Sequence, residues 1–519
     1  MPIRRRRRQR PTITAPRSSR GWRRSRRGWG SVSEGLPGGA YAPPLGESPW
    51  ARQPPRGQNR DRTDDGGRGV LTLLHDHFLV VAGIVAAAVC VVFILQQRRT
   101  PQSAVAWIFF IMLVPYLAVP VFLALGVRKQ GTRFPPLSFT GPQKEEMAVD
   151  APPLAETFRR LGAPPAVRGN VVRLNATPQE AQAALEEVIA SAHHSLDICL
   201  YIVDRDDSGR RFLHLLADKA REGVHVRLVL DRLGSLFPPR KALAAYREAG
   251  GELRWFSPFL HPPDNGHLNL RNHRKLAIAD GRRAWTGGRN VGDDYFSPGG
   301  WTDLGMRLEG PVVQHLWDVF HSDWDVTGGA RATDLPDSRA PAGDAVLQLV
   351  PTGPDDPGDA LHEGLVQAIH AATRRVWIAT PYFVPTEHLE LALVTAARRG
   401  LDVRLLVPQH SNKRVTDFAR GAYLRDLDRR GARILRHPEM LHAKAGLIDG
   451  AGWVGSANFD VRSMLLNFET TLFLYDEETV SELELWFGER MAEAREGVSR
   501  PHLTRRLLEN TFRLGAPFL

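Results

Sequence analysis

The chain has very little cysteine, and the two residues present, Cys90 and Cys199, make a disulfide framework unexpected. Cys90 lies in a long apolar run and Cys199 in a predicted buried strand, so a cysteine zinc site is not expected either. We interpret both as apolar filler. Because Asp, Glu and His show no convincing metal-ligand spacing, we predict no metal and no cofactor.

Lysine is absent from the first 69 residues, which contain 17 arginines and five acidic residues. Their net charge of +12 compares with +11 for the whole chain, so the remainder carries about −1. A segment so rich in Arg, Gly, Pro and Ser cannot bury a core, and we predict that residues 1–69 form a disordered tail. The near-neutral remainder is not typical of a nucleic-acid binder, and anionic lipid is the better partner for the tail.

Charge is also missing from two long apolar runs, Phe78 to Leu95 and Ala104 to Val127, which are separated only by QQRRTPQS. A membrane span needs about 20 apolar residues, so the pattern predicts a transmembrane hairpin within residues 70–130. A buried soluble helix is the alternative, but two adjacent runs favour the hairpin. A secretory signal peptide is disfavoured because the first run begins far from Met1.

The charges beside these runs predict their orientation. The arginine-rich tail precedes the first run, and Arg128, Lys129 and Arg133 follow the second. Together they outweigh Arg98 and Arg99 in the loop between the runs. By the positive-inside rule, the regions before and after the hairpin are both expected in the cytoplasm.

The remainder of the chain contains an internal repeat. Ala220 to Asp231 matches Ala397 to Pro408, and each reads as a helix end, a glycine and a buried strand. Ile189 to Ile202 matches Ile369 to Phe383, again a helix followed by an apolar strand. Alternating helices and strands predict two α/β units whose sheets are largely parallel and covered on both faces.

These patterns set the expected domain boundaries. A segment rich in Pro and polar residues, 131–165, is interpreted as a linker. The two repeated units are then expected over residues 166–337 and 338–519, each long enough for a core of its own.

The repeat contains two copies of a short motif, His-x-Lys followed by Asp. The copies are His273, Lys275 and Asp280, and His442, Lys444 and Asp449. Each is followed by a glycine-containing turn and an asparagine: Gly287, Gly288 and Asn290 in the first copy, and Gly455, Ser456 and Asn458 in the second. Asp449 lies one residue closer to its turn than Asp280 does. The duplication favours a two-part phosphate site over a chance pattern.

Strand geometry explains how such a site is built. Residues two apart in a strand share a face, so the His and Lys of each copy are expected to face one pocket, with the residue between them facing away. Gly288 and Ser456 would let the backbone approach an anion closely, and Asn290 and Asn458 would add amide donors. Two such halves supply the positioning and charge stabilisation that phosphoryl transfer requires, without a metal.

The paired motifs resemble the HxKxxxxD signatures of the phospholipase D superfamily. Within this superfamily, roughly residues 70–519 resemble bacterial cardiolipin synthases. The stretches that carry the resemblance are YIVDRDDSG, GGRNVGDDY, WTDLGMRLEGPVV, TPYFVPTE and GSANFDVRSMLLNFE. The resemblance implies two halves packed about a pseudo-twofold axis, with the active site at their interface. It also implies an inner-membrane protein of several spans whose catalytic halves are cytoplasmic.

The resemblance further implies roles for individual residues. His273 is expected to attack phosphorus and His442 to act as general acid and then base, although sequence symmetry permits the exchange. Asp303 and Glu469 occupy matching positions after the two turns, and each is expected to accept a hydrogen bond from its imidazole. Asp280 and Asp449 belong to the catalytic motif, but their place at strand ends beside glycine favours a structural use.

The expected function is therefore a phosphatidyl transfer that converts two phosphatidylglycerol molecules into cardiolipin and glycerol. A membrane-bound phospholipase D that hydrolyses phospholipids to phosphatidic acid would use the same residues. An inactive lipid-binding adaptor is disfavoured by the two intact His-Lys pairs, and a nuclease by the near-neutral body. The acceptor alcohol and the oligomeric state are left open.

Overall fold

The computed structural model describes residues 65–96, 101–126, 134–140, 151–257, 270–330, 340–356, 358–499 and 501–514. The prediction of a disordered tail falls outside these residues, except that helix α1 already begins at Asp65. The chain divides into a segment, Met1–Leu71, and a compact body, Thr72–Leu519, and the body contains both repeated units.

Among the described helices, one is long and apolar enough to cross a membrane: residues Thr72–Gln96 of α1 (Asp65–Gln96). The second apolar run is divided into α2 (Pro101–Leu113), α3 (Pro115–Val121) and the π-helical turn η1 (Phe122–Gly126). Pro115 explains the break, because the residue before a proline is pushed out of the helical region, and Val114 has φ −139°. A second continuous span over 104–127 is therefore absent from this described part, and the two-span hairpin stays a prediction.

The first repeated unit comprises β1 (Val167–Asn175), α5 (Pro178–Ala190), β2 (Ser195–Leu200), α6 (Asp207–Arg221), β3 (His225–Asp231), α7 (Arg240–Glu248), β4 (Glu252–Phe256), β5 (Leu276–Ala279), β6 (Arg283–Gly287), α8 (Asp293–Phe296), β7 (Gly305–Glu309) and α9 (Val312–Val326). Local sequence signals set several helix starts. Thr177 and Glu180 form a capping box at α5, and Asp206 caps α6.

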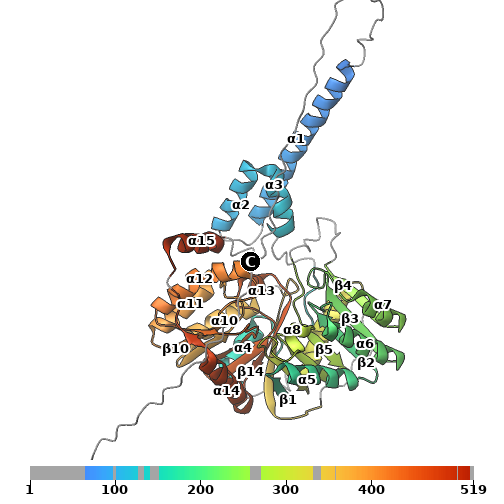
Figure 1. Ribbon diagram of the computed structural model, residues 1–519, viewed down its shortest axis with the longest axis vertical. Coiled ribbons are helices and arrows are strands. Elements are labelled where there is room, and N and C mark those ends of the chain that lie inside the picture. The colour runs from blue at the N-terminus through green and yellow to red at the C-terminus, as the bar shows by residue number, and fades with distance from the viewer. Residues whose placement is uncertain are drawn as a thin grey trace, which may run out of the picture. The chain divides into compact units, whose positions relative to one another are not determined.

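The second unit comprises β8 (Ala345–Thr352), α10 (Ala360–Ala371), β9 (Arg375–Ala379), α11 (Glu387–Arg398), β10 (Asp402–Pro408), α12 (Arg414–Arg429), β11 (Arg433–His437), β12 (Ala445–Ile448), β13 (Ala451–Gly455), α13 (Val461–Leu465), β14 (Glu469–Leu474), α14 (Glu477–Glu493), β15 (Arg495–Glu496) and α15 (Leu503–Leu514). Figure 1 shows the two units side by side.

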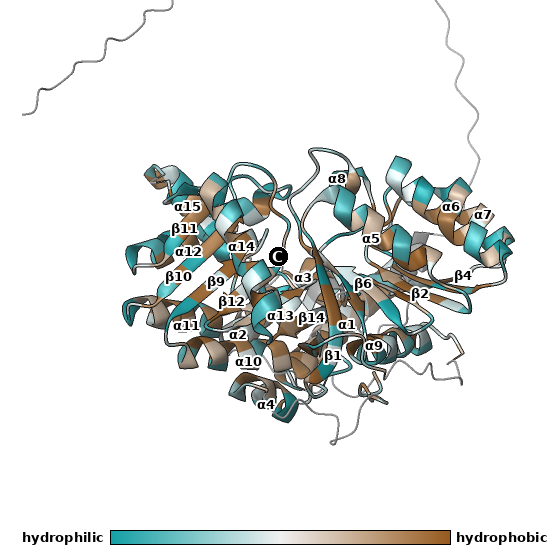
Figure 2. Cartoon of the chain, turned by 90° about the horizontal axis from the view of Figure 1, so that it is seen from below, coloured by the Kyte–Doolittle hydropathy of each residue, from teal (hydrophilic) through white to brown (hydrophobic). Residues whose placement is uncertain are grey.

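All strands of both units join one sheet, in the order β15-β11-β10-β9-β12-β13-β14-β8-β1-β7-β6-β5-β2-β3-β4. Read outward from the antiparallel β8–β1 junction, the strand order is the same in both units, apart from the added β15. This repetition confirms the duplicated α/β fold. In Figure 2 the strands are mostly brown, while teal collects on the outer faces of the flanking helices.

The prediction that the sheets are largely parallel is wrong. Among the described strands, only β2, β3 and β4 in one unit and β9, β10 and β11 in the other are paired in parallel. The motif strand of each unit reverses direction, since β5 pairs antiparallel with β2 and β12 with β9. Each motif strand also pairs antiparallel with the next strand, β6 or β13, through a short connection that needs no crossover helix.

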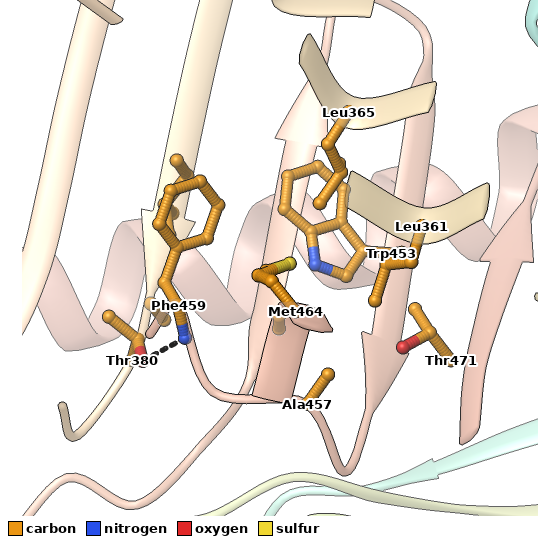
Figure 3. A pocket seen from close by; sticks show the side chains of 11 residues that line it. Leu361, Leu365, Thr380, Trp453, Ala457, Phe459, Met464 and Thr471 are labelled. Atoms are coloured by element: carbon orange, nitrogen blue, oxygen red, sulfur yellow. Dashed lines mark hydrogen bonds between the residues drawn. The ribbon is translucent and has the colours of Figure 1, made fainter. Parts of the chain in front are cut away.

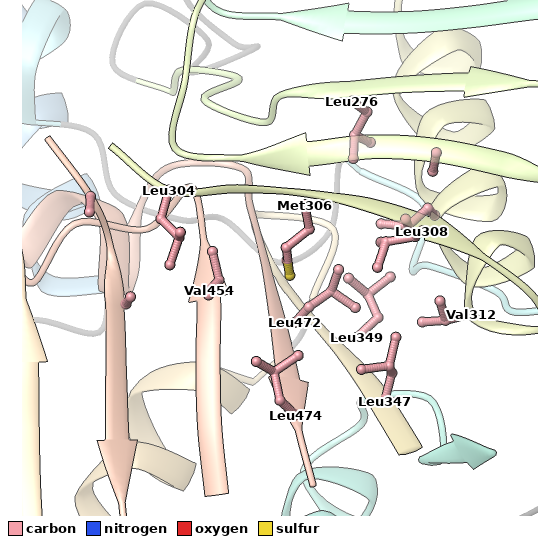
Figure 4. Packing of buried hydrophobic residues seen from close by; sticks show 14 of the residues in the cluster. Leu276, Leu304, Met306, Leu308, Val312, Leu347, Leu349, Val454, Leu472 and Leu474 are labelled. Carbon is pink, nitrogen blue, oxygen red and sulfur yellow. The ribbon is translucent and has the colours of Figure 1, made fainter. Parts of the chain in front are cut away.

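The two units share a hydrophobic core as well as a sheet. Leu304, Met306 and Leu308 of the first unit lie in one cluster with Leu347 and Leu349 of the second, and further residues of β13 and β14 join them (Figure 4). Each unit also has a core of its own. The halves are therefore held together by buried apolar surface, which fixes the interface rigidly.

Part of the segment expected to be a linker is folded. Residues Pro153–Arg160 form α4, which packs on α10 of the second unit. Phe158 is fully buried in that unit's core, against Phe473 and the glycine at position 364. The second unit thus takes in a helix that precedes the first unit in sequence, so the linker boundaries 131–165 do not hold.

Candidate active site

Each motif histidine lies just before the strand that its motif contains, at the end of the sheet where the parallel strands finish. His273 and Lys275 lie just before β5, and His442 and Lys444 just before β12. All four side chains are buried: His273 is 9 % exposed and the other three less. That His and Lys share a face stays a prediction, and the residue between them in the first copy, Arg274, has buried partners of its own.

Arg274 enters a buried network at the domain interface. Its guanidinium donates to Asp323 at 2.5 Å, to Asp355 at 3.3 Å and to the carbonyl of Thr352 at 3.1 Å. The second copy has an alanine, Ala443, at this position. The arginine therefore ties the first motif to the second unit, and its Nε also donates to the carbonyl of Glu469 at 3.3 Å.

The backbone of each histidine is tied to the other unit. The amide of His273 donates to the carbonyl of Phe468 at 2.8 Å, and the amide of Phe468 donates back to Arg271 at 2.9 Å. In the second copy, the amide of His442 donates to the carbonyl of Thr302 at 2.7 Å. Phe468 and Thr302 immediately precede Glu469 and Asp303 in sequence.

As a result, each imidazole is paired with a carboxylate of the other unit. His273 Nδ1 lies 2.8 Å from Glu469 Oε2, and His442 Nδ1 lies 2.7 Å from Asp303 Oδ2. The sequence indicated these carboxylates but not that the pairs cross the interface. With Nδ1–H of His273 directed at a carboxylate, Nε2 is its ring nitrogen left for reaction, whereas His442 Nε2 lies 3.2 Å from Lys444 Nζ.

The predicted turn residues support these carboxylates. A Cβ at Gly288 would lie 2.3 Å from Asp303 Oδ1, so a side chain there would displace the carboxylate. At the matching position Ser456 donates from Oγ to Glu469 Oε2 at 2.6 Å. The anion approached by each turn is therefore a carboxylate of the protein, whereas the sequence suggested a bound phosphate.

Asn290 and Asn458 are also buried at this edge. Asn290 donates from Nδ2 to the hydroxyl of Tyr295 at 2.8 Å, so its amide hydrogens are partly committed. The side-chain oxygens of both asparagines are buried without a hydrogen-bond partner. Their role as amide donors to a phosphate stays a prediction.

The two lysines lie beside the imidazoles. Lys275 Nζ donates to the carbonyl of His273 at 2.6 Å. Lys444 Nζ contacts the carbonyl of His442 and lies 2.8 Å from its Nδ1. The site therefore concentrates two ammonium groups, two imidazoles and two carboxylates at the interface of the units.

Burial is the largest cause of the pKa shifts of the histidines and lysines in this site. It lowers the pKa of His273 to about 4 and that of His442 to about 3, although the facing carboxylates pull both values upward. It also lowers the pKa of Lys444 to about 8 and that of Lys275 well below its usual range. Burial alone would raise the pKa of Glu469, but the neighbouring His273 holds it below its ordinary value. Both imidazoles are thus neutral at pH 7, and both carboxylates are charged.

The family profile described as "Cardiolipin synthase, PLD-like domain" matches residues 185–324 and 365–491. Cardiolipin synthase A of Pseudomonas fluorescens is 34% identical over 81% of this chain and 91% of its own length. Cardiolipin synthase of Geobacillus thermodenitrificans is 31% identical over 80% of this chain and 89% of its own. The chain belongs to the cardiolipin synthase family.

The fold agrees with this cardiolipin synthase family assignment. The crystal structure of phosphatidylserine synthase from Haemophilus influenzae superposes with a TM-score of 0.51, covering 70% of this chain and 98% of that one at 13% identity. At this identity the likeness concerns the fold alone. The family profile, with its PLD-like domain, confirms the duplicated phospholipase D-like fold expected from the motifs.

In this member of the cardiolipin synthase family, the hydrogen bonds of the motif aspartates favour the structural use, and their inclusion among the catalytic residues stays a prediction. Asp280 and Asp449 lie at the far ends of β5 and β12 from the histidines, each with φ 50°. The Asp280 carboxylate accepts the backbone N–H groups of residues 193–195 at 2.8–2.9 Å, and Asp449 accepts those of residues 373–375 at 2.9–3.0 Å. Each carboxylate therefore fixes the turn that leads from a helix into β2 or β9.

Four aromatic residues that the sequence did not single out as site residues surround the imidazoles. The Tyr201 ring centroid lies 4.8 Å from that of His273. Tyr295 and Trp301 lie 5.3 Å from the His442 ring, and Tyr382 lies 6.4 Å from it. Their place in the sequence could have indicated two of them, because Tyr201 and Tyr382 follow β2 and β9, the strands that pair with the motif strands.

A separate small cavity lies within the second unit. Leu361, Leu365, Trp453 and Met464 line it, with Thr380, whose hydroxyl oxygen accepts the amide of Phe459 at 3.1 Å (Figure 3). Its lining contains no titratable group. The cavity is thus a packing gap and not the reaction site.

Replacing Asp280 by Ala should lower stability and spare chemistry. Three backbone donors lose a charged acceptor, at a cost of about 1–3 kcal/mol. Burial would raise the Asp280 pKa, but these donors hold it below its ordinary value, so the stabilisation is present at neutral pH and is lost as pH falls through that lowered value. We expect a lower thermal unfolding midpoint in detergent, with turnover per folded molecule retained below that midpoint. Asp449→Ala is the matched control and should behave alike. Lost turnover with an unchanged midpoint would contradict the structural assignment.

The affinity for a phosphodiester should weaken as pH rises through about 8, since Lys444 loses its charge there. Dihexyl phosphate suits the measurement because it keeps one negative charge across the range, and calorimetric titrations between pH 6 and 9.5 would follow its Kd. Lys444→Arg should keep its affinity to higher pH, because a guanidinium remains charged. A wild-type Kd that is constant up to pH 9.5 would show that Lys444 does not hold the anion.

Proposed function

We propose that this chain is a membrane-bound phosphatidyltransferase that joins two phosphatidylglycerol molecules into cardiolipin and releases glycerol. The supporting observation is the crossed pair of His-carboxylate contacts beside two buried lysines, in a chain whose relatives are named cardiolipin synthases. Phosphoryl transfer needs positioning and charge stabilisation, and these groups supply both.

In the first step, Nε2 of His273 attacks the phosphorus of one phosphatidylglycerol. Lys275 and Lys444 stabilise the charge on the phosphoryl oxygens. His442, protonated once the bound anion raises its pKa, gives its proton to the departing glycerol oxygen. A phosphatidyl group is then bonded to His273, and Glu469 offsets the positive charge on that ring.

In the second step, His442 is neutral and takes the proton from a hydroxyl of a second phosphatidylglycerol. The hydroxyl oxygen attacks phosphorus, the bond to His273 Nε2 breaks, and cardiolipin leaves. Two displacements at one phosphorus give net retention of configuration. Water in place of the second lipid would give phosphatidic acid, the product of the alternative hydrolytic function.

The apolar helix α1 fits this proposal because both substrates are bilayer lipids. Anchoring confines the enzyme and its substrates to one surface and raises their effective concentration. The arrangement we propose has two spans and both catalytic units on the cytoplasmic side of the bacterial inner membrane, with the arginine-rich tail against anionic lipid.

The reaction itself is tested in phosphatidylglycerol vesicles. The reconstituted wild-type protein should form cardiolipin and release glycerol in equal amounts. Phosphatidic acid as the sole product would favour hydrolysis.

The roles of the histidines are tested with a phosphatidyl p-nitrophenyl ester, whose leaving group needs no general acid. His442→Ala should release one equivalent of p-nitrophenolate and retain a labelled lipid phosphate on the protein. His273→Ala should show no burst, with turnover reduced at least about 10³-fold. His193→Ala, an exposed histidine outside the site, is the control. A burst in His273→Ala and none in His442→Ala would exchange the two assignments.

A further inference from the structure

The two units match at the imidazoles and lysines but differ in charge around them. In the first unit, the segments after β2 and β6 contain two arginines, Arg205 and Arg289, and several aspartates. The aspartates include Asp204, Asp206, Asp293 and Asp294. Burial and the neighbouring carboxylates raise the pKa of Asp204 to about 6. These aspartates add negative charge to the first unit's side, where the buried cation Arg271 is paired with Asp231.

The second unit presents cations on its side of the site. Lys413 lies in the segment after β10, and its Nζ is 4.6 Å from the ring centroid of Tyr382. The Tyr382 ring is in turn 6.4 Å from that of His442. Arg462, at the start of α13, stands where the first unit has Asp294, so the matched position changes sign.

The position of Lys413 is fixed by its own segment. Ser411 Oγ accepts the amide of Lys413 and donates to its carbonyl, both at 3.1 Å. The neighbouring Asn412 accepts the Tyr382 hydroxyl at 2.5 Å, which joins this segment to the aromatic residue beside His442. Asp460 offsets part of the charge of Lys413 and of Arg462, and Arg462 also interacts electrostatically with Asp231 of the first unit. The remaining positive charge contrasts with the four aspartates of the first unit.

The proposed reaction gives this asymmetry a use. Lys275 and Lys444 are occupied by the phosphodiester that reacts. The acceptor lipid brings a second phosphodiester, three carbons from its terminal hydroxyl, and the two anions repel each other. A cation outside the motif is needed to hold the second anion near the first.

We propose that Lys413 binds the phosphodiester of the acceptor lipid on the second unit's side of the site. This inference rests on the proposed function. It places the acceptor hydroxyl beside His442, the imidazole assigned as base, and leaves His273 to hold the phosphatidyl group. The two sides of the pseudo-symmetric site then have different roles: the donor lipid binds at His273 and the acceptor lipid at His442.

The test measures how the phosphatidyl-enzyme intermediate partitions between two acceptor alcohols, phosphatidylglycerol and ethanol. Vesicles of phosphatidylglycerol with added ethanol allow the phosphatidyl-enzyme to form cardiolipin or phosphatidylethanol. The first step is common to both products and cancels in their ratio. Ethanol carries no phosphate, so only the lipid acceptor uses Lys413.

In Lys413→Ala the ratio of cardiolipin to phosphatidylethanol should fall about tenfold, the order expected for a lost charge-assisted contact. Lys413→Arg should restore most of the ratio, and Arg414→Ala, which removes the adjacent exposed cation, should keep the wild-type value. An unchanged ratio in Lys413→Ala, including an equal loss of both products, would overturn the acceptor site. A wild-type protein that makes no cardiolipin would instead overturn the proposed function.

Discussion

The crossed contact between each imidazole and a carboxylate of the other unit is the constraint on which the rest of the structure depends. A hydrogen bond of 2.7–2.8 Å tolerates little movement, so the two units must keep one relative position. The β8–β1 pairing, the shared apolar core and the Arg274 network all act at this interface. The extensive burial between the units is therefore a requirement of the site as much as a source of stability.

Burial at this interface also sets the chemical state of the site. Water is excluded from the histidines and lysines, which lowers their pKa values and strengthens every charge interaction that remains. Neutral imidazoles are ready to attack or to accept a proton, while the arriving phosphodiester supplies the negative charge that the ammonium groups face. The charges of the site thus suit an anion, and the proposed steps use no metal.

Much of this arrangement could be predicted from the sequence, because it follows from local periodicity and from repetition. Alternation along a strand predicts one shared face for His273 and Lys275, and the repeat predicts a second such pair in a second unit. The crossing of Glu469 and Asp303 could not be predicted, since it depends on how the units dock. The same holds for Gly288, whose missing side chain makes room for a carboxylate distant from it in sequence. Helix α4 could not be predicted from the sequence, because its apolar face is short and the helix it packs on, α10, lies some 200 residues further along the chain.

The exchange of carboxylates between the units has a consequence for how such a chain can evolve. After duplication, a change near Asp303 in one copy alters the histidine of the other, so neither copy can accumulate substitutions in isolation. The two copies can diverge independently only at residues that contact their own copy alone. A protein with a single repeat could reach the same chemistry only by pairing with a second identical chain.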